Sequence, residues 1–235
     1  MNEPTKKGKV QVLVMSNFFN MDNPFFTTLG KICDMLFISV VWLLLCIPIV
    51  TIGPANTAMY YATVKVIRRE RGYLFREFFK SFKLNFKRAA ILGVVLTIMF
   101  VVLSFDLLWA YGNLGVSGST GSILFGIFIA ITFLLVCFST YAFPVLSRFD
   151  MTIKQLVKAG AFMSMRHLPF TLIMVIVTAV GIVGTMFIPL LIFIAPSAVV
   201  LINSFLMERI LKKYMPGTEE ATEEEQTGKD EWYLE

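Results

Sequence analysis

Long apolar stretches without lysine or arginine alternate along this sequence with short basic clusters. The basic clusters occupy residues 6–31, 65–88, 148–166 and 209–213. The intervals without a basic residue are 32–64, 89–147 and 167–208. A helix that crosses a bilayer needs about 20 apolar residues, so each interval can be read as a hairpin that leaves and returns to one side of a membrane. The pattern predicts an all-α, polytopic transmembrane helical bundle.

The three hairpins give six expected spans, of which the second is short. The spans cover about residues 31–52, 54–67, 89–110, 122–146, 168–187 and 189–208. With six spans every basic cluster faces the cytoplasm, as the positive-inside rule requires. With five spans, residues 54–67 stay at the inner interface and the N-terminal lysines face outward. Charge favours six spans and length favours five; we favour six, because the Lys/Arg bias sets orientation.

Two amphipathic helices, 73–88 and 152–166, are expected to link the hairpins on the cytoplasmic side. In the first, Leu74, Phe75, Phe78, Phe82 and Phe86 share one face. Its other face carries Arg76, Lys80, Lys83 and Lys87. An aromatic face beside a basic one is typical of a helix lying in the headgroup plane and binding anionic lipid, although packing on the inner ends of the spans explains the apolar face equally well. Thr152 and Gln155 form a capping box at the start of the second helix.

The ends of the chain differ from the expected membrane domain at 23–213. Residues 1–22 are an N-terminal extension, and Asn23-Pro24 marks the start of the first helix, since proline is favoured at the first helical position. Residues 214–235 are rich in acidic side chains. That composition cannot bury enough apolar surface to fold, so the tail is expected to be disordered.

Composition supports the membrane reading and narrows the partners. Hydrophobic residues make up 57% of the 235 residues and charged residues 16%, against about 25% charged in a soluble domain. The net charge is +5. In a membrane protein a basic body indicates cytoplasmic loops beside anionic lipids. We therefore expect a lipid bilayer as the partner, and no nucleic acid.

Polar residues within the apolar intervals are the candidates for a functional path. Asn56, Thr57, Tyr60 and Thr63 follow one another at helical spacing, and Asn203 is expected to join them. Asp106 is an acidic residue in the middle apolar interval, although Trp109 nearby suggests the outer interface. Such a set can line a small-molecule path, or it can hold helices together by hydrogen bonds.

Gly53 and Pro54 are expected to act as a structural pivot just before the polar stripe. Glycine adopts backbone angles closed to other residues, and proline cannot donate a backbone hydrogen bond. Irregular backbone at membrane depth persists only where it is buried in protein or faces water. The pair is therefore expected to form the turn of the first hairpin.

Catalytic chemistry has few candidates in this sequence. His167 is the only histidine, and neither a P-loop nor a metal-binding motif such as H-E-x-x-H occurs. General acid–base or metal catalysis usually needs several such groups together. We expect no catalytic residue, no cofactor and no metal site, and a protein that is not an enzyme.

Two stretches carry a family resemblance: IPIVTIGPANTAMYYATVKVIRRERGYLFREFFKSFKLNFKRA (Ile47–Ala89) and NFFNMDNPFF (Asn17–Phe26). They resemble the signature and the N-terminal opening of the YesL family of bacterial membrane proteins, which has no established activity. The resemblance implies a multi-pass protein of the bacterial plasma membrane, often encoded near sugar-uptake systems. The expected function is a non-enzymatic accessory or regulator linked to carbohydrate uptake, with a sugar-uptake transporter as partner. The alternative is a small-molecule transporter or channel that uses the polar path.

Overall fold

The computed structural model describes residues 24–114 and 119–214, and within them it contains helices and no strand. The elements are α2 (Pro24–Leu45), η1 (Ile49–Thr51), α3 (Ile52–Ala62), η2 (Thr63–Arg68), α4 (Leu74–Gly112), α5 (Ser119–Arg148), α6 (Ile153–Arg166), α7 (Leu168–Phe187), η3 (Pro189–Phe193) and α8 (Ala195–Lys212). The all-α fold class is thereby confirmed. The expected N-terminal extension and almost all of the acidic tail lie outside the described residues.

Local sequence signals set several helix ends. The first described helix, α2, begins at Pro24, where proline's fixed backbone angle suits the first turn. The capping box predicted for α6 is present: the Thr152 backbone N–H donates to the Gln155 side chain over 3.0 Å. This bond satisfies a backbone donor that has no partner inside the helix.

The chain reverses direction earlier than the sequence predicts. The connection between α2 and α3 covers Cys46–Thr51 and includes Pro48 and the 3₁₀ turn η1. Gly53 and Pro54, expected to form this turn, instead lie in the first turn of α3. Proline is tolerated there because the first four N–H groups of a helix have no intrahelical partner.

The expected interfacial helix at 73–88 and the span at 89–110 are one continuous helix, α4, of 39 residues. It is about 58 Å long at 1.5 Å per residue. Two separate helices were expected because the residue type changes sharply after Arg88. The stretch between Lys87 and Leu92 contains neither glycine nor proline, so nothing there interrupts the backbone hydrogen bonds.

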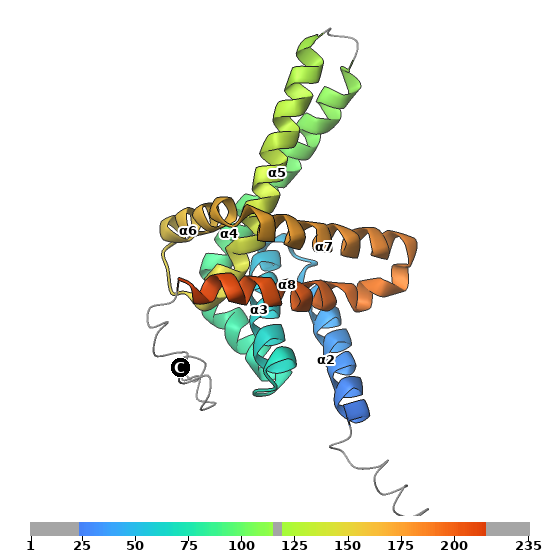
Figure 1. Cartoon of the computed structure of the whole chain (residues 1–235), viewed down its shortest axis with the longest axis vertical. Coiled ribbons are helices and arrows are strands. Elements are labelled where there is room, and N and C mark those ends of the chain that lie inside the picture. Colours follow the sequence, from blue (N-terminus) through green and yellow to red (C-terminus); the bar gives the residue numbers. More distant parts are fainter. Residues whose placement is uncertain (1–23, 115–118, 215–235) are drawn as a thin grey trace, which may run out of the picture.

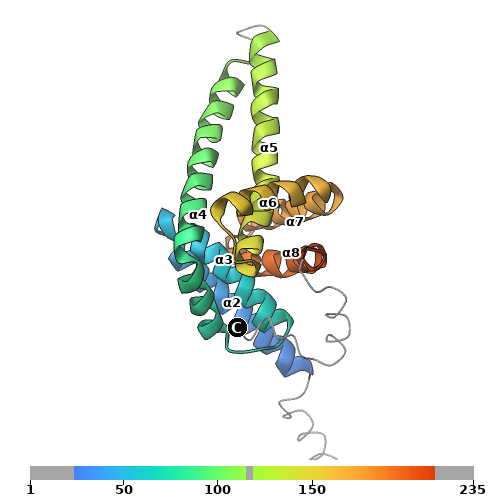
Figure 2. The same cartoon turned by 90° about the vertical axis from the view of Figure 1, so that its left-hand side faces the viewer.

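The helices form two hairpins that point in different directions (Figure 1). The α4–α5 hairpin projects beyond the rest of the molecule, in the second view as well (Figure 2). The α7–α8 hairpin crosses the base of the α4–α5 hairpin. The helices α2 and α3 lie on the side away from the tip of the α4–α5 hairpin. The two hairpins are therefore splayed apart.

Within the described residues, four helices are long and apolar enough to cross a membrane. Their spans are Thr28–Leu45, Leu74–Gly112, Thr120–Arg148 and Leu168–Phe187. Six spans are therefore not confirmed. The helix α3 has 11 residues and continues directly into the six-residue π-helical turn η2, which leaves it short of the roughly 20 residues that a spanning helix needs. The helix α8 has 18 residues and includes the charged Glu208, Arg209 and Lys212.

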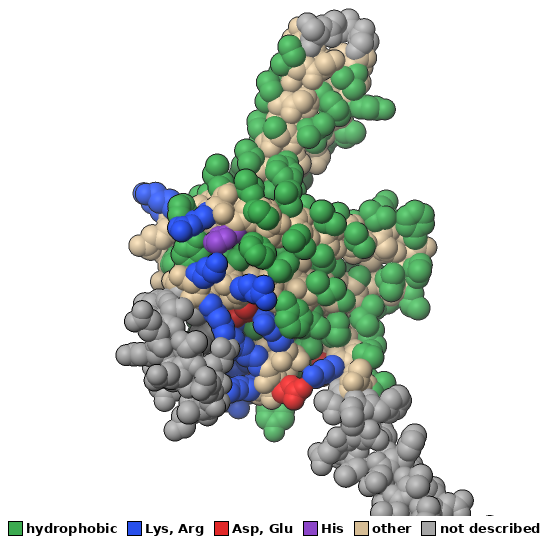
Figure 3. Space-filling model, viewed as in Figure 1, with side chains coloured by type: hydrophobic (Ala, Val, Ile, Leu, Met, Phe, Trp, Pro, Cys, Tyr) green, Lys and Arg blue, Asp and Glu red, His purple; other side chains and the backbone are tan. Residues whose placement is uncertain are grey.

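The surface of the described residues is divided by charge (Figure 3). Hydrophobic side chains cover the α4–α5 hairpin and much of α7 and α8, whereas lysine and arginine gather on the side away from the hairpin tip. Many large apolar side chains are exposed, Phe105, Leu108 and Phe187 among them. Since lipid is the solvent that accepts such a surface, the fold supports a transmembrane protein.

Candidate functional site

A buried charge cluster joins three helices at the base of the two hairpins. Glu208 of α8 and Arg148 of α5 have side chains that are 2% and 0% exposed. The Arg148 guanidinium donates to Glu208 Oε1 through Nε at 3.0 Å and Nη2 at 2.7 Å. The Tyr60 hydroxyl of α3 donates to the same oxygen at 2.7 Å. Arg69 approaches the second oxygen, with 3.6 Å between Nη2 and Oε2.

The π-helical turn η2 brings further charged residues to this cluster. Arg68 Nη1 donates to the Ser204 carbonyl at 3.0 Å, and its guanidinium lies 4.5 Å from the ring centroid of Phe205 on α8. Lys65 Nζ donates to Glu77 Oε2 of α4 at 2.9 Å, and both side chains are 10% exposed. Single π-helical turns occur frequently at functional sites.

Together these contacts tie α3, α4, α5 and α8 to one another through charge. Removing two ions from water costs several kcal/mol each, which only close, hydrogen-bonded geometry offsets. Buried charges in membrane proteins are therefore rare and are functional candidates by default. Among the described residues, no group of three or more His, Cys, Asp or Glu side chains lies close enough together to hold a metal ion. What the geometry provides is a fixed junction between helix ends.

Tyr60 is among the polar residues predicted from the sequence, whereas Glu208 is not. The structure buries Glu208 against Arg148 and Tyr60. A single acidic residue in the last apolar stretch was the available signal. Its partner Arg148 is 60 residues away, so only the helix packing reveals the pair.

The expected path residues occupy separate contacts. Asn56 accepts a hydrogen bond from Trp42 Nε1 at 2.8 Å, and the Thr57 hydroxyl donates to the Gly53 carbonyl of its own helix at 3.1 Å. Tyr60 belongs to the charge cluster. The Thr63 hydroxyl is buried without a hydrogen bond to any described residue.

The other two path candidates lie elsewhere. Asn203 joins α8 to α7 by donating to Thr178 Oγ1 at 3.1 Å and to the Met174 carbonyl at 3.3 Å. Asp106 is partly exposed on α4, near the end of that helix at Gly112. The polar residues of α3 and Asn203 therefore contribute to contacts within and between helices. Asp106 lies apart from these contacts.

Gly53 lies where α3 and α4 touch through their backbones. A Cβ atom added to Gly93 of α4 would lie 2.7 Å from the Gly53 Cα, and one added to Gly53 would overlap the Ala89 carbonyl oxygen. Only glycine allows two helices to approach this closely. Pro54 and Ala55 beside Gly53 are buried in the same contact region.

The aromatic face of the first half of α4 packs in part against α2 and α3. Phe78 is 2% exposed and packs with Leu74, Ile38 and Met59 in the core between α2, α3 and α4. Phe75 and Phe86 remain exposed. The face is thus partly packed on the inner helix ends and partly free for lipid. The basic set, Arg76, Lys80, Lys83 and Lys87, is exposed throughout.

Changing Arg76, Lys80, Lys83 and Lys87 together to Gln is expected to weaken contact between α4 and anionic lipid headgroups. Each charge near an anionic surface contributes at most about 1 kcal/mol. The measurement is the salt dependence of contact between α4 and the headgroups. It is made on purified protein reconstituted in nanodiscs, and anionic lipid is compared with neutral lipid. The matched control is Lys154→Gln with Lys158→Gln on α6; equal effects of the two sets would contradict a special role for α4.

His167, the single histidine, lies between α6 and α7. Its Nε2 is 3.0 Å from the Tyr214 hydroxyl. Burial, together with the nearby charges of Lys213 and Arg166, lowers the pKa of His167 from its ordinary value. The neutral imidazole is therefore favoured, which suits a hydrogen bond that fixes the end of α8 against the start of α7.

Tyr60→Phe is expected to lower the free energy of unfolding by about 2 kcal/mol, because a hydrogen bond to a buried charged group is lost. The neighbouring Tyr61→Phe is the control. The Tyr61 hydroxyl accepts a bond from Lys65 at 3.3 Å, and Lys65 keeps its closer partner Glu77 when that hydroxyl is removed. Thermal unfolding in detergent checks both. Equal losses would contradict the role of Tyr60 in the cluster.

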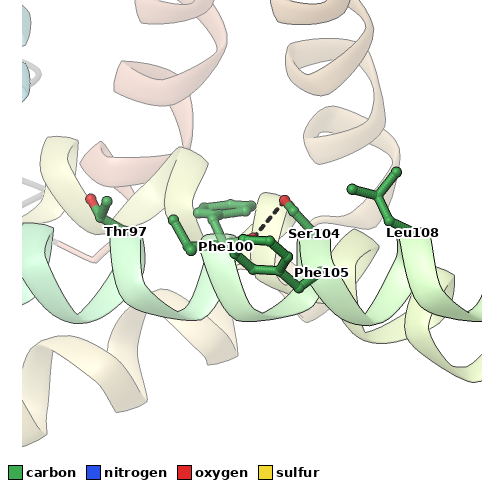
Figure 4. Close-up of a pocket in the computed structure, with 6 residues that line it drawn as sticks. Thr97, Phe100, Ser104, Phe105 and Leu108 are labelled. Atoms are coloured by element: carbon green, nitrogen blue, oxygen red, sulfur yellow. Dashed lines mark hydrogen bonds between the residues drawn. The ribbon is translucent and has the colours of Figure 1, made fainter.

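A cleft runs along one face of α4 in the projecting hairpin (Figure 4). It has a volume of about 520 Å³ and is lined by Thr97, Phe100, Val101, Ser104, Phe105 and Leu108. The Thr97 and Ser104 hydroxyls donate to carbonyls of their own helix at 2.8 and 2.7 Å. All six lining residues belong to α4, so no other described helix lines the cleft.

Comparison with known proteins gives one match. Residues 35–107 match the profile of a family described as "Protein of unknown function, DUF624". The matched region includes α3, η2 and most of α4, hence Tyr60, Lys65 and Arg69, but neither Arg148 nor Glu208. It is consistent with the resemblance to the YesL family, which the match does not name. No curated protein and no solved structure matches this chain.

Proposed function

We propose that this protein is a non-enzymatic membrane accessory that docks another integral membrane protein along its α4–α5 hairpin. The observation that carries the proposal is the projection of this hairpin beyond the other described helices, with an open cleft along α4. Membrane helices associate through small residues and close packing. Thr97 and Ser104 supply small side chains on the cleft, and Phe100 and Phe105 supply the ridges beside them.

The charge cluster supports this proposal by fixing the base of the hairpin. Arg148 lies at the end of α5, and the Glu208 carboxylate holds it against α8 and Tyr60. Arg88 of α4 pairs with Asp150, just after α5. A hairpin held at its base by paired charges presents its free end in one orientation, which favours a defined partner surface.

The lining of the α4 cleft and the family resemblance together indicate the class of the partner. The cleft lining contains no charged residue, so the partner presents an apolar transmembrane helix there. The family resemblance makes a sugar-uptake transporter of the bacterial plasma membrane the first partner to test. The alternative function, transport along a polar path, requires polar residues that follow one route, and here Asn56, Tyr60 and Asn203 serve three different contacts.

Mild-detergent purification from native membranes tests the two functions against each other. We expect a membrane protein to co-purify in a fixed ratio, and to be lost with Thr97→Leu combined with Ser104→Leu. Ser122→Leu, an exposed change on α5, is the control and should keep the partner. Solute flux through liposomes containing only the purified protein, without any co-purifying partner, would contradict the accessory role.

A further inference from the structure

A second cavity, separate from the α4 cleft, lies between the ends of α2 and α3 and the α7–α8 hairpin. It has a volume of about 390 Å³, within the range of about 300–1,000 Å³ typical of ligand pockets. Trp42 and Asn56 line one part, and Thr178, Ala195 and Val199 line another. No charged residue contributes to it. The cavity therefore fits an uncharged, largely apolar group.

Asn56 gives this cavity a free hydrogen-bond-donating group, its side-chain NH₂. Trp42 Nε1 donates to Asn56 Oδ1 at 2.8 Å. Because an indole N–H is only a donor, this bond fixes which side of the amide is oxygen and leaves the NH₂ group turned away from the indole. The Asn56 NH₂ group has no acceptor among residues 24–114 and 119–214.

The other polar atoms of the cavity are already engaged. The Thr178 hydroxyl donates to the Met174 carbonyl at 2.8 Å, and the Thr185 hydroxyl donates to the Ile182 carbonyl at 2.7 Å. The Asn56 amide is thus the donor that remains for an occupant. An acceptor such as a carbonyl oxygen matches it, at one end of an otherwise apolar space.

The surroundings indicate where the occupant comes from. The cavity is partly open, and exposed apolar side chains line it, including Ile182 at 59% and Ile192 at 41%. Helices with such surfaces are covered by lipid. Trp42 lies near the end of α2, and tryptophan is enriched at the membrane interface, the depth at which phospholipid ester groups occur.

We propose that this cavity binds one acyl chain of a membrane phospholipid, whose ester carbonyl accepts a hydrogen bond from the Asn56 amide. The chain fills the apolar part between α7 and α8. There Gly181 lets the two helices meet, because a Cβ atom on Gly181 would overlap Val199. The site does not depend on a docked partner protein.

The test uses full-length protein in nanodiscs containing a phospholipid with a photoreactive diazirine on its acyl chain. We expect labelling of peptides from α3 and α8, reduced at least severalfold by Ala195→Phe, which fills the cavity. Ile202→Phe, at an exposed position of α8, is the matched control and should label like the wild type. Labelling unchanged by Ala195→Phe would overturn the site.

A comparison of ester and ether lipids tests the hydrogen bond separately. Wild-type protein should bind a diester phospholipid about fivefold more tightly than its diether analogue, the ratio expected for one net hydrogen bond. Asn56→Leu should remove this difference even if it also lowers stability. Equal binding of both lipids by the wild type, or equal competition by a free fatty acid, would overturn the phospholipid assignment.

Discussion

Glu208→Gln is expected to lower the free energy of unfolding by about 3–5 kcal/mol, the loss typical of breaking a buried ion pair from one side. The substitution keeps the shape of the side chain and removes its charge. Arg148, whose side chain is 0% exposed, then loses the charged oxygen that accepts both of its hydrogen bonds to Glu208, in a site that water reaches poorly. Thermal or denaturant unfolding in detergent gives the measurement.

The exposed pair of Lys31 and Glu70 provides the control for this prediction. Its side chains are 39% and 60% exposed, so Glu70→Gln should cost less than about 1 kcal/mol. A double variant, Glu208→Leu with Arg148→Leu, should lose less than the sum of the two single changes, because it leaves neither charge uncompensated. Strictly additive losses would contradict a direct interaction.

Gly53→Val is expected to destabilise the protein by about 3 kcal/mol, at the upper end of the cost of overpacking. The added side chain overlaps the Ala89 carbonyl oxygen, and two helix backbones cannot move apart without losing the contact of α3 with α4. Unfolding in detergent again provides the measurement, with folded yield as a second readout.

Two control substitutions test whether the destabilisation by Gly53→Val comes from the contact between α3 and α4. Gly126→Val on α5 places the same side chain where nothing lies within 4 Å, and it should be close to neutral. Pro54→Ala should cost much less than Gly53→Val, because proline in a first helical turn displaces no intrahelical bond. A wild-type melting temperature for Gly53→Val would refute the close helix contact.

The sequence predicts the helices of this protein better than their arrangement. Hydropathy and capping signals place the start of α2 at Pro24 and the capping box at Thr152, because these depend on neighbouring residues. The continuity of α4 was missed, since a change from amphipathic to apolar residues alters what surrounds a helix without breaking its hydrogen bonds. The turn before α3 was misplaced because Gly53 serves helix contact instead of chain reversal.

The candidate site was predictable only in part. Tyr60 follows from the polar stripe on α3, but its partner Glu208 lies 148 residues away, and no local pattern joins them. The Trp42–Asn56 bond likewise depends on how α2 packs against α3. How the helices pack determines which residues meet across them. The periodicity within one helix carries no information about that packing.

Site-specific photocrosslinking in native membranes tests the proposed docking surface most directly. A photoreactive amino acid at Val101, in the α4 cleft, is compared with one at Ile176, an exposed position on α7. The account predicts a crosslink from position 101 to one other membrane protein of defined mass, and none from position 176. Crosslinks to lipid alone at both positions, or to a second copy of this chain at position 101, would contradict it.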